Sequence, residues 1–314
     1  MQVIQVKNLK KYFTLGMLKR YSIKALDDVS FSIEQSEIFG VLGESGCGKS
    51  TLGLVLSRIE KETEGEIFFK DKKISGSTRL DRTTRKEIQI IFQNPYESFD
   101  QRMTIGDSLR IPLKINGIGV NNSQRTEIIK EFLHRAGLEP VNAFLTRYPH
   151  ELSGGQLQRL SLLRAMMLNP AFLIADECVS MLDLSVRASV INLMLELVEA
   201  KKTTVMFITH DISLAKYVSH RIVVLYLGKI VEIGNSEDVV EKPLHPYTKV
   251  LISYSPAIFE KKEKIKPKEL MYVSQMTAGC NFASRCPYAD SFCESNVPQL
   301  REIEPNHWAA CHKI

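Results

Sequence analysis

The feature that most constrains the fold of this chain is a nine-residue stretch, GESGCGKST, at residues 43 to 51. Gly43, Gly48, Lys49 and Ser50 match the pattern G-x-x-x-x-G-K-[ST], and the preceding run EIFGVLG predicts a short buried strand. A strand, such a loop and a helix together point main-chain N–H groups and a positive helix end at a phosphate group. A plain glycine-rich turn would need neither Lys49 nor Ser50, so a phosphate loop is predicted.

The residues of this loop have separate expected roles. Lys49 is expected to reach the β and γ phosphates of a nucleotide, and Ser50 to ligate Mg²⁺. The predicted nucleotide-binding residues of the loop are Gly43, Glu44, Ser45, Gly46, Cys47, Gly48, Lys49, Ser50 and Thr51.

Length and composition set broad limits on the fold. The chain has 314 residues, 44% of them hydrophobic and 25% charged, which is ordinary for a globular protein of roughly two domains. Its formal net charge of +5 is too small to argue for nucleic-acid binding. No apolar run approaches the ~20 residues that cross a bilayer. The start MQVIQVKNLKKYF lacks the apolar core of a signal peptide, so the chain is expected to be cytoplasmic.

The hydrophobic pattern predicts an α/β fold. Strand-like segments occur in VIQVKNL, in ALDDVSFSIEQSEIFGVLG and in GEIFFKDKKI, whereas residues from about 95 to 168 show helical spacing. Strand and helix then alternate through AFLIADE, a helix from about Leu184 to Lys201, TTVMFITHD, another helix and RIVVLYLGKIVEIG. This alternation favours a mostly parallel sheet covered by helices. A charged linker, EKKEKIKPKEL, and a cysteine-bearing tail follow, and no internal repeat is visible.

An acidic pair ends one of the predicted strands. Asp176 is expected to hold Mg²⁺ and Glu177 to polarise the attacking water in ATP hydrolysis. An acidic pair after a strand is often a solvated loop start. Together with a phosphate loop it indicates a nucleotide hydrolase.

The motif LSGGQ, Leu152 to Gln156, carries a specific resemblance to the ATP-binding cassette (ABC) ATPases. Further motifs follow in that family's order: FQNP with Gln93, LIADE, SMLD with Asp183, and FITHD with His210. The resemblance covers about residues 1 to 235. It implies a P-loop NTPase (RecA-like) core, an antiparallel β subdomain and an inserted α-helical subdomain at about residues 95 to 168.

The resemblance also implies roles for residues outside the phosphate loop. The signature segment of one chain would contact ATP held by the phosphate loop of a partner, although SGG alone is also typical of a capped helix start. Its predicted nucleotide contacts are Ser153, Gly154, Gly155 and Gln156, and Asp183 is predicted to join them.

Three further side chains are assigned by the same resemblance. Tyr12 would stack on adenine, with Phe13 and Tyr21 as neighbouring aromatic alternatives. His210 would hydrogen-bond the γ-phosphate. Gln93 would sense Mg²⁺ and water while its loop touches a membrane partner. The predicted catalytic residues are therefore Glu177, His210, Gln93 and Lys49, and the predicted Mg²⁺ ligands are Ser50, Gln93 and Asp176.

One position departs from the family pattern. The residue after the acidic pair is often proline in relatives, and here it is Cys178. A slight change in loop stiffness is expected, with the chemistry retained.

The C-terminal tail indicates which class of ABC ATPase the chain resembles. LHPYTKVLI at residues 244 to 252 and GCNFASRCPYADSFC at 279 to 293 resemble the C-terminal extension of oligopeptide and dipeptide importer ATPases, a group that includes nickel and glutathione importers. The extension is expected to span residues 236 to 314. The segment KYFTLGMLKRYSIKALDDVSF resembles the second ATPase subunit of such systems, so a heterodimer is expected.

The resemblance implies an ATPase at the cytoplasmic face of the membrane that powers peptide import. Its expected partners are a second ABC ATPase subunit, two transmembrane permease subunits and an extracellular substrate-binding protein, with no nucleic acid. The alternatives are import of nickel or another small solute, or a soluble ABC regulator acting on nucleic acid or ribosomes. Such regulators tend to carry two cassettes or a long coiled coil, and neither is visible here.

Four cysteines lie in the tail: Cys280, Cys286, Cys293 and Cys311, separated by five, six and seventeen residues. Thiols stay reduced in the cytoplasm, which disfavours disulfides. Four thiolates suit Zn²⁺ or a [4Fe–4S] cluster, and spacings wider than those typical of structural zinc favour the cluster. Four unliganded thiols remain the alternative, and His307 and His312 are possible substitute ligands.

Overall fold

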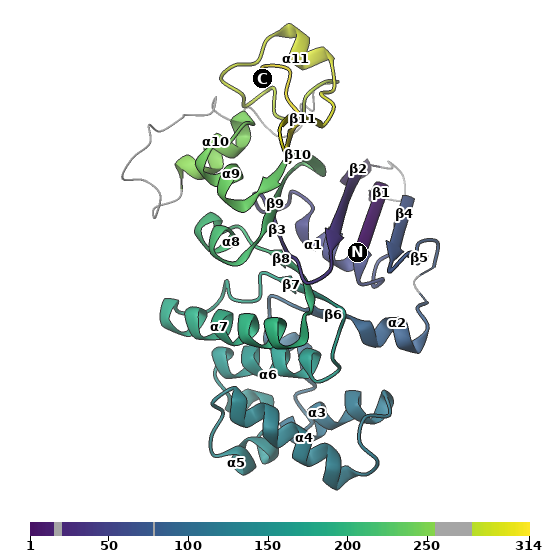
Figure 1. The fold of residues 1–314 in the computed structure, drawn as a ribbon, viewed down its shortest axis with the longest axis vertical. Helices are drawn as coiled ribbons and strands as arrows, with labels where there is room; N and C mark the ends of the chain where they lie inside the picture. Colours follow the sequence, from purple (N-terminus) through teal and green to yellow (C-terminus); the bar gives the residue numbers. More distant parts are fainter. Residues whose placement is uncertain (16–20, 78, 255–277) are drawn as a thin grey trace. The chain divides into compact units, whose positions relative to one another are not determined.

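The structure of the chain, a computed structural model, describes residues 1–15, 21–77, 79–254 and 278–314. The fold is drawn in Figure 1, and the chain divides into two compact units. The first unit comprises Met1–Thr78 and Met206–Ile314, and the second comprises Arg79–Val205. The predicted charged linker EKKEKIKPKEL lies outside the described residues.

The N-terminal part of the first unit is a four-stranded sheet, in purple and blue in Figure 1. Its order is β2 (Tyr21–Glu34), β1 (Gln2–Leu15), β4 (Glu64–Phe69) and β5 (Lys72–Lys73), and all its pairs are antiparallel. Alternating apolar residues such as Ile4, Val6 and Ile67 are buried on one face, as the period of a strand requires. The predicted N-terminal strands are therefore confirmed.

The first unit also contains the strand that precedes the phosphate loop and the strands that pair with the C-terminal tail. β3 (Ile38–Leu42) pairs in parallel with β9 (Arg221–Tyr226), and β9 pairs antiparallel with β10 (Lys229–Asn235). The tail adds β12 (His307–Ala309) to β10, and β11 (Arg301–Glu304) to β12, both antiparallel. The parallel pairing was predicted, but the antiparallel strands of the tail were not, so this sheet is mixed. β8 (Thr204–Ile208) lies at the division between the units.

Five helices among the described residues belong to the first unit: α1 (Lys49–Leu56), α8 (Ile212–Val218), α9 (Ser236–Glu241), α10 (Pro246–Ser253) and α11 (Ser291–Ser295). A buried cluster joins β9 and β10 to α8, α9 and α10, and it includes Tyr226, Tyr247 and Phe282. The tail thus packs on the same core as the strand beside β3.

The second unit is mainly helical. Its strands β6 (Ile88–Ile91) and β7 (Phe172–Asp176) pair in parallel. Its helices are α2 (Arg82–Glu87), α3 (Ile105–Ile115), α4 (Asn122–Arg135), α5 (Val141–Thr146), α6 (Gly154–Met166) and α7 (Leu184–Lys201), with short 3-10 turns at Pro95–Ser98 and Pro149–Glu151. Figure 1 shows α6 and α7 side by side.

Local sequence explains where these helices begin. The side chains of Thr104, Asn121 and Ser153 each accept a hydrogen bond from a main-chain N–H in the first turn of α3, α4 and α6. Helical residues were predicted over most of α4, α6 and α7. None of the helices in the described part of the chain is both long and apolar enough to cross a membrane.

Candidate nucleotide site

The phosphate loop follows a strand whose five residues are all buried. Two of its glycines are required by close packing. A Cβ on Gly48, where φ is +109°, would lie 2.2 Å from the main-chain oxygen of Ala25, and one on Gly43 would lie 2.4 Å from that of Leu225. The loop is therefore held tightly between β2 and the end of β9.

Lys49 lies inside the curl of this loop and is only 5% exposed. Its Nζ donates to the main-chain oxygens of Gly43, at 2.8 Å, and Glu44, at 3.0 Å. These contacts fix the ammonium group at the start of α1, where a phosphate would meet both the lysine and the helix N-terminus. Ser45, Gly46 and Ser50 are exposed beside it.

His210 lies two residues after the end of β8 and is exposed. The N–H of Thr209 donates to the main-chain oxygen of Val41 at 3.1 Å, and the N–H of Asp211 donates to Oγ1 of Thr209 at 3.0 Å. Because Val41 is in the strand that leads into the phosphate loop, the structure brings His210 to the same strand edge as that loop. Contact of both Lys49 and His210 with one γ-phosphate stays a prediction that this placement allows.

The predicted adenine-stacking residue, Tyr12, is partly buried in the antiparallel sheet. Its hydroxyl donates to Oδ1 of Asp27 at 2.5 Å, and the ammonium of Lys24 lies 5.5 Å from its ring centre. Burial, together with this carboxylate, raises the pKa of Tyr12. The ring centre of the neighbouring Phe13 instead lies 4.6 Å from the ammonium of Lys11. Which aromatic ring meets a base stays a prediction, and the Tyr21 side chain lies outside the described part.

In the second unit, Asp176 is the last residue of β7 and Glu177 follows it directly. Asp176 is 7% exposed, and Glu177 has a φ of +43°, in the left-handed region that non-glycine residues rarely adopt. The N–H and Oγ of Ser180 both donate to the main-chain oxygen of Glu177, at 3.0 and 2.9 Å. Nε2 of Gln93 donates to Oε2 of Glu177 at 3.3 Å and to Oγ of Ser180 at 3.2 Å. Gln93 and Glu177, predicted from separate motifs, are thus brought together.

Cys178, at the position where proline was expected, is 4% exposed. Burial raises the pKa of its thiol to about 12. The thiol therefore stays protonated at neutral pH and acts as a small apolar side chain.

The signature segment begins α6 with a reciprocal cap. Oγ of Ser153 accepts from the N–H of Gln156 at 3.3 Å, and Oε1 of Gln156 accepts from the N–H of Ser153 at 3.0 Å. A Cβ on Gly155 would lie 2.4 Å from Cγ1 of Val186 in α7. The glycine therefore lets α6 and α7 approach closely. Asp183 is exposed at the N-terminus of α7.

Among the four tail cysteines, Cys280 lies within electrostatic reach of Cys286, Cys293 and Cys311. Burial raises the pKa of Cys280 to about 11, and the other three cysteines add to the effect. Within the described ranges, however, no three His, Cys, Asp or Glu side chains are grouped closely enough to hold a metal ion. The predicted iron–sulfur or zinc site is therefore not supported by this structure.

The two substitute ligands are engaged elsewhere. Nε2 of His307 lies 2.8 Å from Oε1 of Glu232, and Nε2 of His312 lies 3.0 Å from the main-chain oxygen of Asn296. Glu232 is fully buried and also accepts the N–H groups of Leu244 and His245, both at 2.8 Å. His307 therefore fastens the tail to β10.

Sequence reasoning missed two residues that contact the phosphate loop. Arg285 and Tyr247 both contact Glu44, the second residue of the loop motif. Both lie in stretches that were recognised as family marks of the tail. Local patterns carry no signal for contacts over such a distance in sequence.

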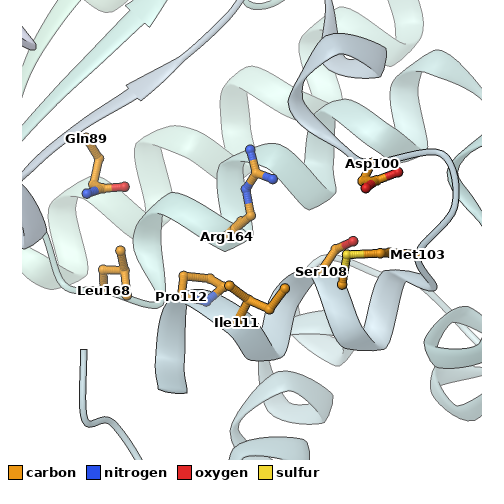
Figure 2. A pocket seen from close by; sticks show the side chains of 8 residues that line it. All are labelled: Gln89, Asp100, Met103, Ser108, Ile111, Pro112, Arg164 and Leu168. Carbon is orange, nitrogen blue, oxygen red and sulfur yellow. The ribbon is translucent and has the colours of Figure 1, made fainter. Parts of the chain in front are cut away.

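A separate pocket of about 290 Å³ lies within the second unit. Figure 2 shows side chains from β6, α3 and α6 and from the loop before α3 around it. The guanidinium of Arg164 lies 4.5 Å from the ring centre of Phe99, and burial lowers its pKa. Ile111, which is 42% exposed, provides an apolar edge. The lining residues are Gln89, Asp100, Met103, Ser108, Ile111, Pro112, Arg164 and Leu168.

A buried strand, a glycine loop closed around Lys49 and a helix starting at that lysine define a P-loop nucleotide-binding protein. Comparison with known protein families identifies a more specific class than the geometry does. Residues 26–180 match the ABC transporter family, and residues 231–293 match the oligopeptide/dipeptide transporter C-terminal region.

Curated relatives match over nearly the whole chain. The oligopeptide transport ATP-binding protein AppF of Bacillus subtilis is 40% identical over 99% of this chain and 97% of its own length. The di/tripeptide transport ATP-binding protein DppF of Pseudomonas aeruginosa is 39% identical over 99% of this chain and 97% of its own. The chain belongs to the ABC transporter family of ATP-binding proteins and is an ATPase.

Solved structures agree with this assignment. The dimeric structure of MJ0796, a bacterial ABC transporter cassette, is 30% identical, with a TM-score of 0.66, and it covers 74% of this chain and 98% of that one. CbiO1 of Clostridium perfringens, at 23% identity and a TM-score of 0.64 over 77% of this chain and 91% of that one, shares the fold.

Proposed function

We propose that this chain is the ATP-hydrolysing subunit of an importer that moves di- or oligopeptides across the cytoplasmic membrane. The observation that carries the proposal is the near full-length similarity to AppF and DppF. The family match of residues 231–293 supports the same class of cargo. The chain would lie peripherally at the cytoplasmic face of that membrane.

The proposed chemistry uses the residues described above. Lys49 would neutralise charge on the β and γ phosphates, His210 would hold the γ-phosphate, and Glu177 would polarise the attacking water. The hydrogen bond from Gln93 to Glu177 supports a shared role for these two residues. Mg²⁺ would neutralise phosphate charge, and the oxygen donors of Ser50, Gln93 and Asp176 suit this hard cation.

The proposed domains are an ABC cassette at residues 1–235, with a helical subdomain at about 95–168, and an importer-type extension at 236–314. Two cassettes would close head to tail, so that Ser153 and its signature segment meet ATP on a second ATPase subunit. A dimeric relative, MJ0796, supports pairing of cassettes. The partner is proposed to be a different chain, giving a heterodimer.

The pocket in Figure 2 is proposed as the place where a permease subunit docks. It combines the exposed apolar side chain of Ile111 with the charged groups of Asp100 and Arg164. A short amphipathic segment of a membrane subunit would match such a surface. Two permease subunits and an extracellular substrate-binding protein would complete the importer.

The four tail cysteines are proposed to hold a [4Fe–4S] cluster, with Zn²⁺ as the alternative. Cys280 lies within electrostatic reach of the other three cysteines, and four thiolates are a donor set that suits either metal site. Anaerobic purification followed by iron and zinc analysis tests this. About four irons per chain and a broad visible absorbance would indicate the cluster. Zinc alone would indicate a zinc site, and neither metal would indicate packed thiols.

The transport function is tested by reconstituting the chain with its permease and binding-protein subunits in vesicles. Di- and oligopeptides should stimulate ATP hydrolysis and accumulate inside, and Lys49→Ala should abolish both effects. Stimulation by nickel or glutathione alone would reassign the cargo. Stimulation by RNA or ribosomes, without any response to peptides, would favour the soluble regulator.

A further inference from the structure

Two side chains of the C-terminal extension contact Glu44 in the phosphate loop. Nη1 of Arg285 donates to Oε2 of Glu44 at 2.7 Å, and Nη2 donates to Oε1 at 3.0 Å. The main-chain N–H of Glu44 donates to the hydroxyl of Tyr247 at 2.9 Å. Both the side chain and the backbone of one loop residue are thus held by the extension.

The ion pair between Arg285 and Glu44 lies against two aromatic side chains. The side chain of Arg285 is 15% exposed, and its guanidinium lies 5.8 Å from the ring centre of Tyr226 and 5.9 Å from that of Phe282. The hydrogen bond to Glu44 raises the pKa of Arg285, so the guanidinium stays charged. A two-pronged guanidinium contact over aromatic faces fixes geometry better than a loose surface pair does.

The hydroxyl of Tyr247 in α10, which accepts the Glu44 N–H, is equally constrained. Tyr247 is fully buried, and its ring centre lies 4.5 Å from that of Tyr226 and 5.4 Å from that of Phe282. The rings that frame Arg285 therefore also fix the hydroxyl that accepts the Glu44 N–H.

Arg285 comes from a tight turn between the first two tail cysteines. The N–H of Ala283 donates to the oxygen of Cys280 at 3.0 Å, and that of Cys286 donates to the oxygen of Phe282 at 2.9 Å. In the same turn, Nδ2 of Asn281 donates to the oxygen of Leu227 at 3.3 Å.

That contact reaches the other side of the phosphate loop. Leu227 and Gly228 form the turn between β9 and β10, and the N–H of Gly228 donates to the oxygen of Cys47 at 2.9 Å. One tail segment thus contacts Glu44 directly and the loop at Cys47 through a single turn.

The contact at Glu44 continues to the lysine. The main-chain oxygen of Glu44 accepts from Nζ of Lys49 at 3.0 Å. We propose that Arg285 and Tyr247 are positioning residues that act through Glu44 on Lys49, so that the extension shapes the phosphate loop for ATP. The proposal rests on the ATP site of the proposed function and is independent of transport and of any metal in the tail.

A double-mutant cycle on the full-length chain tests the proposal. The Kd for MgATP is measured for wild type, Arg285→Gln, Glu44→Gln and the double variant. Each single variant should weaken MgATP binding by about three- to tenfold, since a partly exposed charged hydrogen-bond pair is lost. Because both substitutions act through one contact, the Kd of the double variant for MgATP should not exceed the higher Kd of the two single variants.

Three more variants separate positioning from general stability. Arg285→Lys keeps the charge but loses the two-pronged contact and should recover part of the affinity. Tyr247→Phe removes only the acceptor for the Glu44 N–H and should also weaken MgATP binding. Arg301→Gln changes an arginine of the same extension that donates to the oxygen of Ile314 and should leave the Kd unchanged.

The outcomes are distinct. If wild type binds MgATP and the two single effects multiply in the double variant, the coupling through Glu44 is wrong. An equal loss in Arg301→Gln would show that loosening of the extension is the cause and would also overturn the proposal. Failure of wild type to bind MgATP would instead overturn the proposed function. Thermal unfolding of each variant confirms that the compared proteins are folded.

Discussion

At the scale of single residues, Glu177 combines a catalytic assignment with an unusual backbone. Its left-handed φ of +43° costs conformational energy, and the two hydrogen bonds from Ser180 to its main-chain oxygen stabilise it. Gln93 reaches its carboxylate from a separate loop. A carboxylate held in this way is oriented before substrate arrives.

Glu177→Gln should keep MgATP binding and lower ATP hydrolysis by at least about a hundredfold, because the amide cannot take a proton from water. The side chain keeps its size and its contact with Gln93. Phosphate release and MgATP binding are measured on the same preparation. Unchanged hydrolysis in the assembled complex would remove Glu177 from the role of base.

At this scale, motif spacing was sufficient for the phosphate loop and the acidic pair. Lys49, Asp176 and His210 stand at the strand or helix ends where the sequence puts them. The contact of Arg285 with Glu44 was beyond reach, because 241 residues separate the two and an ion pair leaves no periodic pattern. The cysteines differ again, because their spacing indicates a donor set although the described residues form no group close enough to hold a metal ion, so the cluster stays a proposal.

At the scale of elements, the approach of α6 to α7 depends on Gly155. Gly155→Ala places a methyl group 2.4 Å from Cγ1 of Val186 and should lower the free energy of unfolding by about 1–3 kcal/mol. Urea unfolding measures the change. Gly154→Ala is the matched control, since its added Cβ would lie 3.8 Å from Leu182, and it should be close to neutral. Adding Val186→Ala to Gly155→Ala should recover stability, and no recovery would refute the steric cause.

The start of α10 predicts a pH dependence. Nδ1 of His245 accepts from the N–H of Tyr247 at 3.0 Å, and burial, assisted by Lys249, lowers the pKa of His245 to about 3. Below the unfolded pKa of about 6.5, the unfolded chain binds a proton that the folded chain does not. Acidification from about pH 6.5 towards 3 therefore lowers the free energy of unfolding through this group, by up to about 1.4 kcal/mol per pH unit.

His245→Asn isolates this effect, because asparagine keeps an acceptor for the helix N-terminus but does not titrate. The variant should lose less stability than wild type as the pH falls from about 6.5 to 4. Chemical unfolding at several pH values gives both curves. Parallel curves would mean that His245 does not control the acid sensitivity.

The predicted elements differ in how well local pattern defines them. α7 begins and ends where its apolar spacing indicated, and the run before the acidic pair became β7. β12 was missed because its three residues, His307–Ala309, are too few for a period. The strand exists through its pairing with β10, where Trp308 lies opposite Ile233.

At the scale of the whole molecule, the proposed head-to-tail pairing gives one chain two half-sites. Lys49 belongs to the phosphate loop that holds ATP, whereas Ser153 begins the segment proposed to meet ATP on another chain. Their order in the sequence predicts both motifs but says nothing about which chain completes which site. That arrangement has to be measured on the assembled protein.

Head-to-tail pairing makes a mixing experiment informative. Lys49→Ala should remove hydrolysis by disabling a chain's own loop, and Ser153→Arg should do so by blocking the partner's ATP. In a mixed dimer the intact loop of the second variant meets the intact signature of the first, which restores one site. If two copies of this chain pair head to tail and the sites act independently, an equal mixture should recover about a quarter of wild-type ATPase activity, since about half of the dimers are mixed and each has one of two sites. The proposed pairing with a different chain instead predicts no recovery. A mixture as inactive as its parents, although both variants are folded, would show that the chain does not pair head to tail with itself.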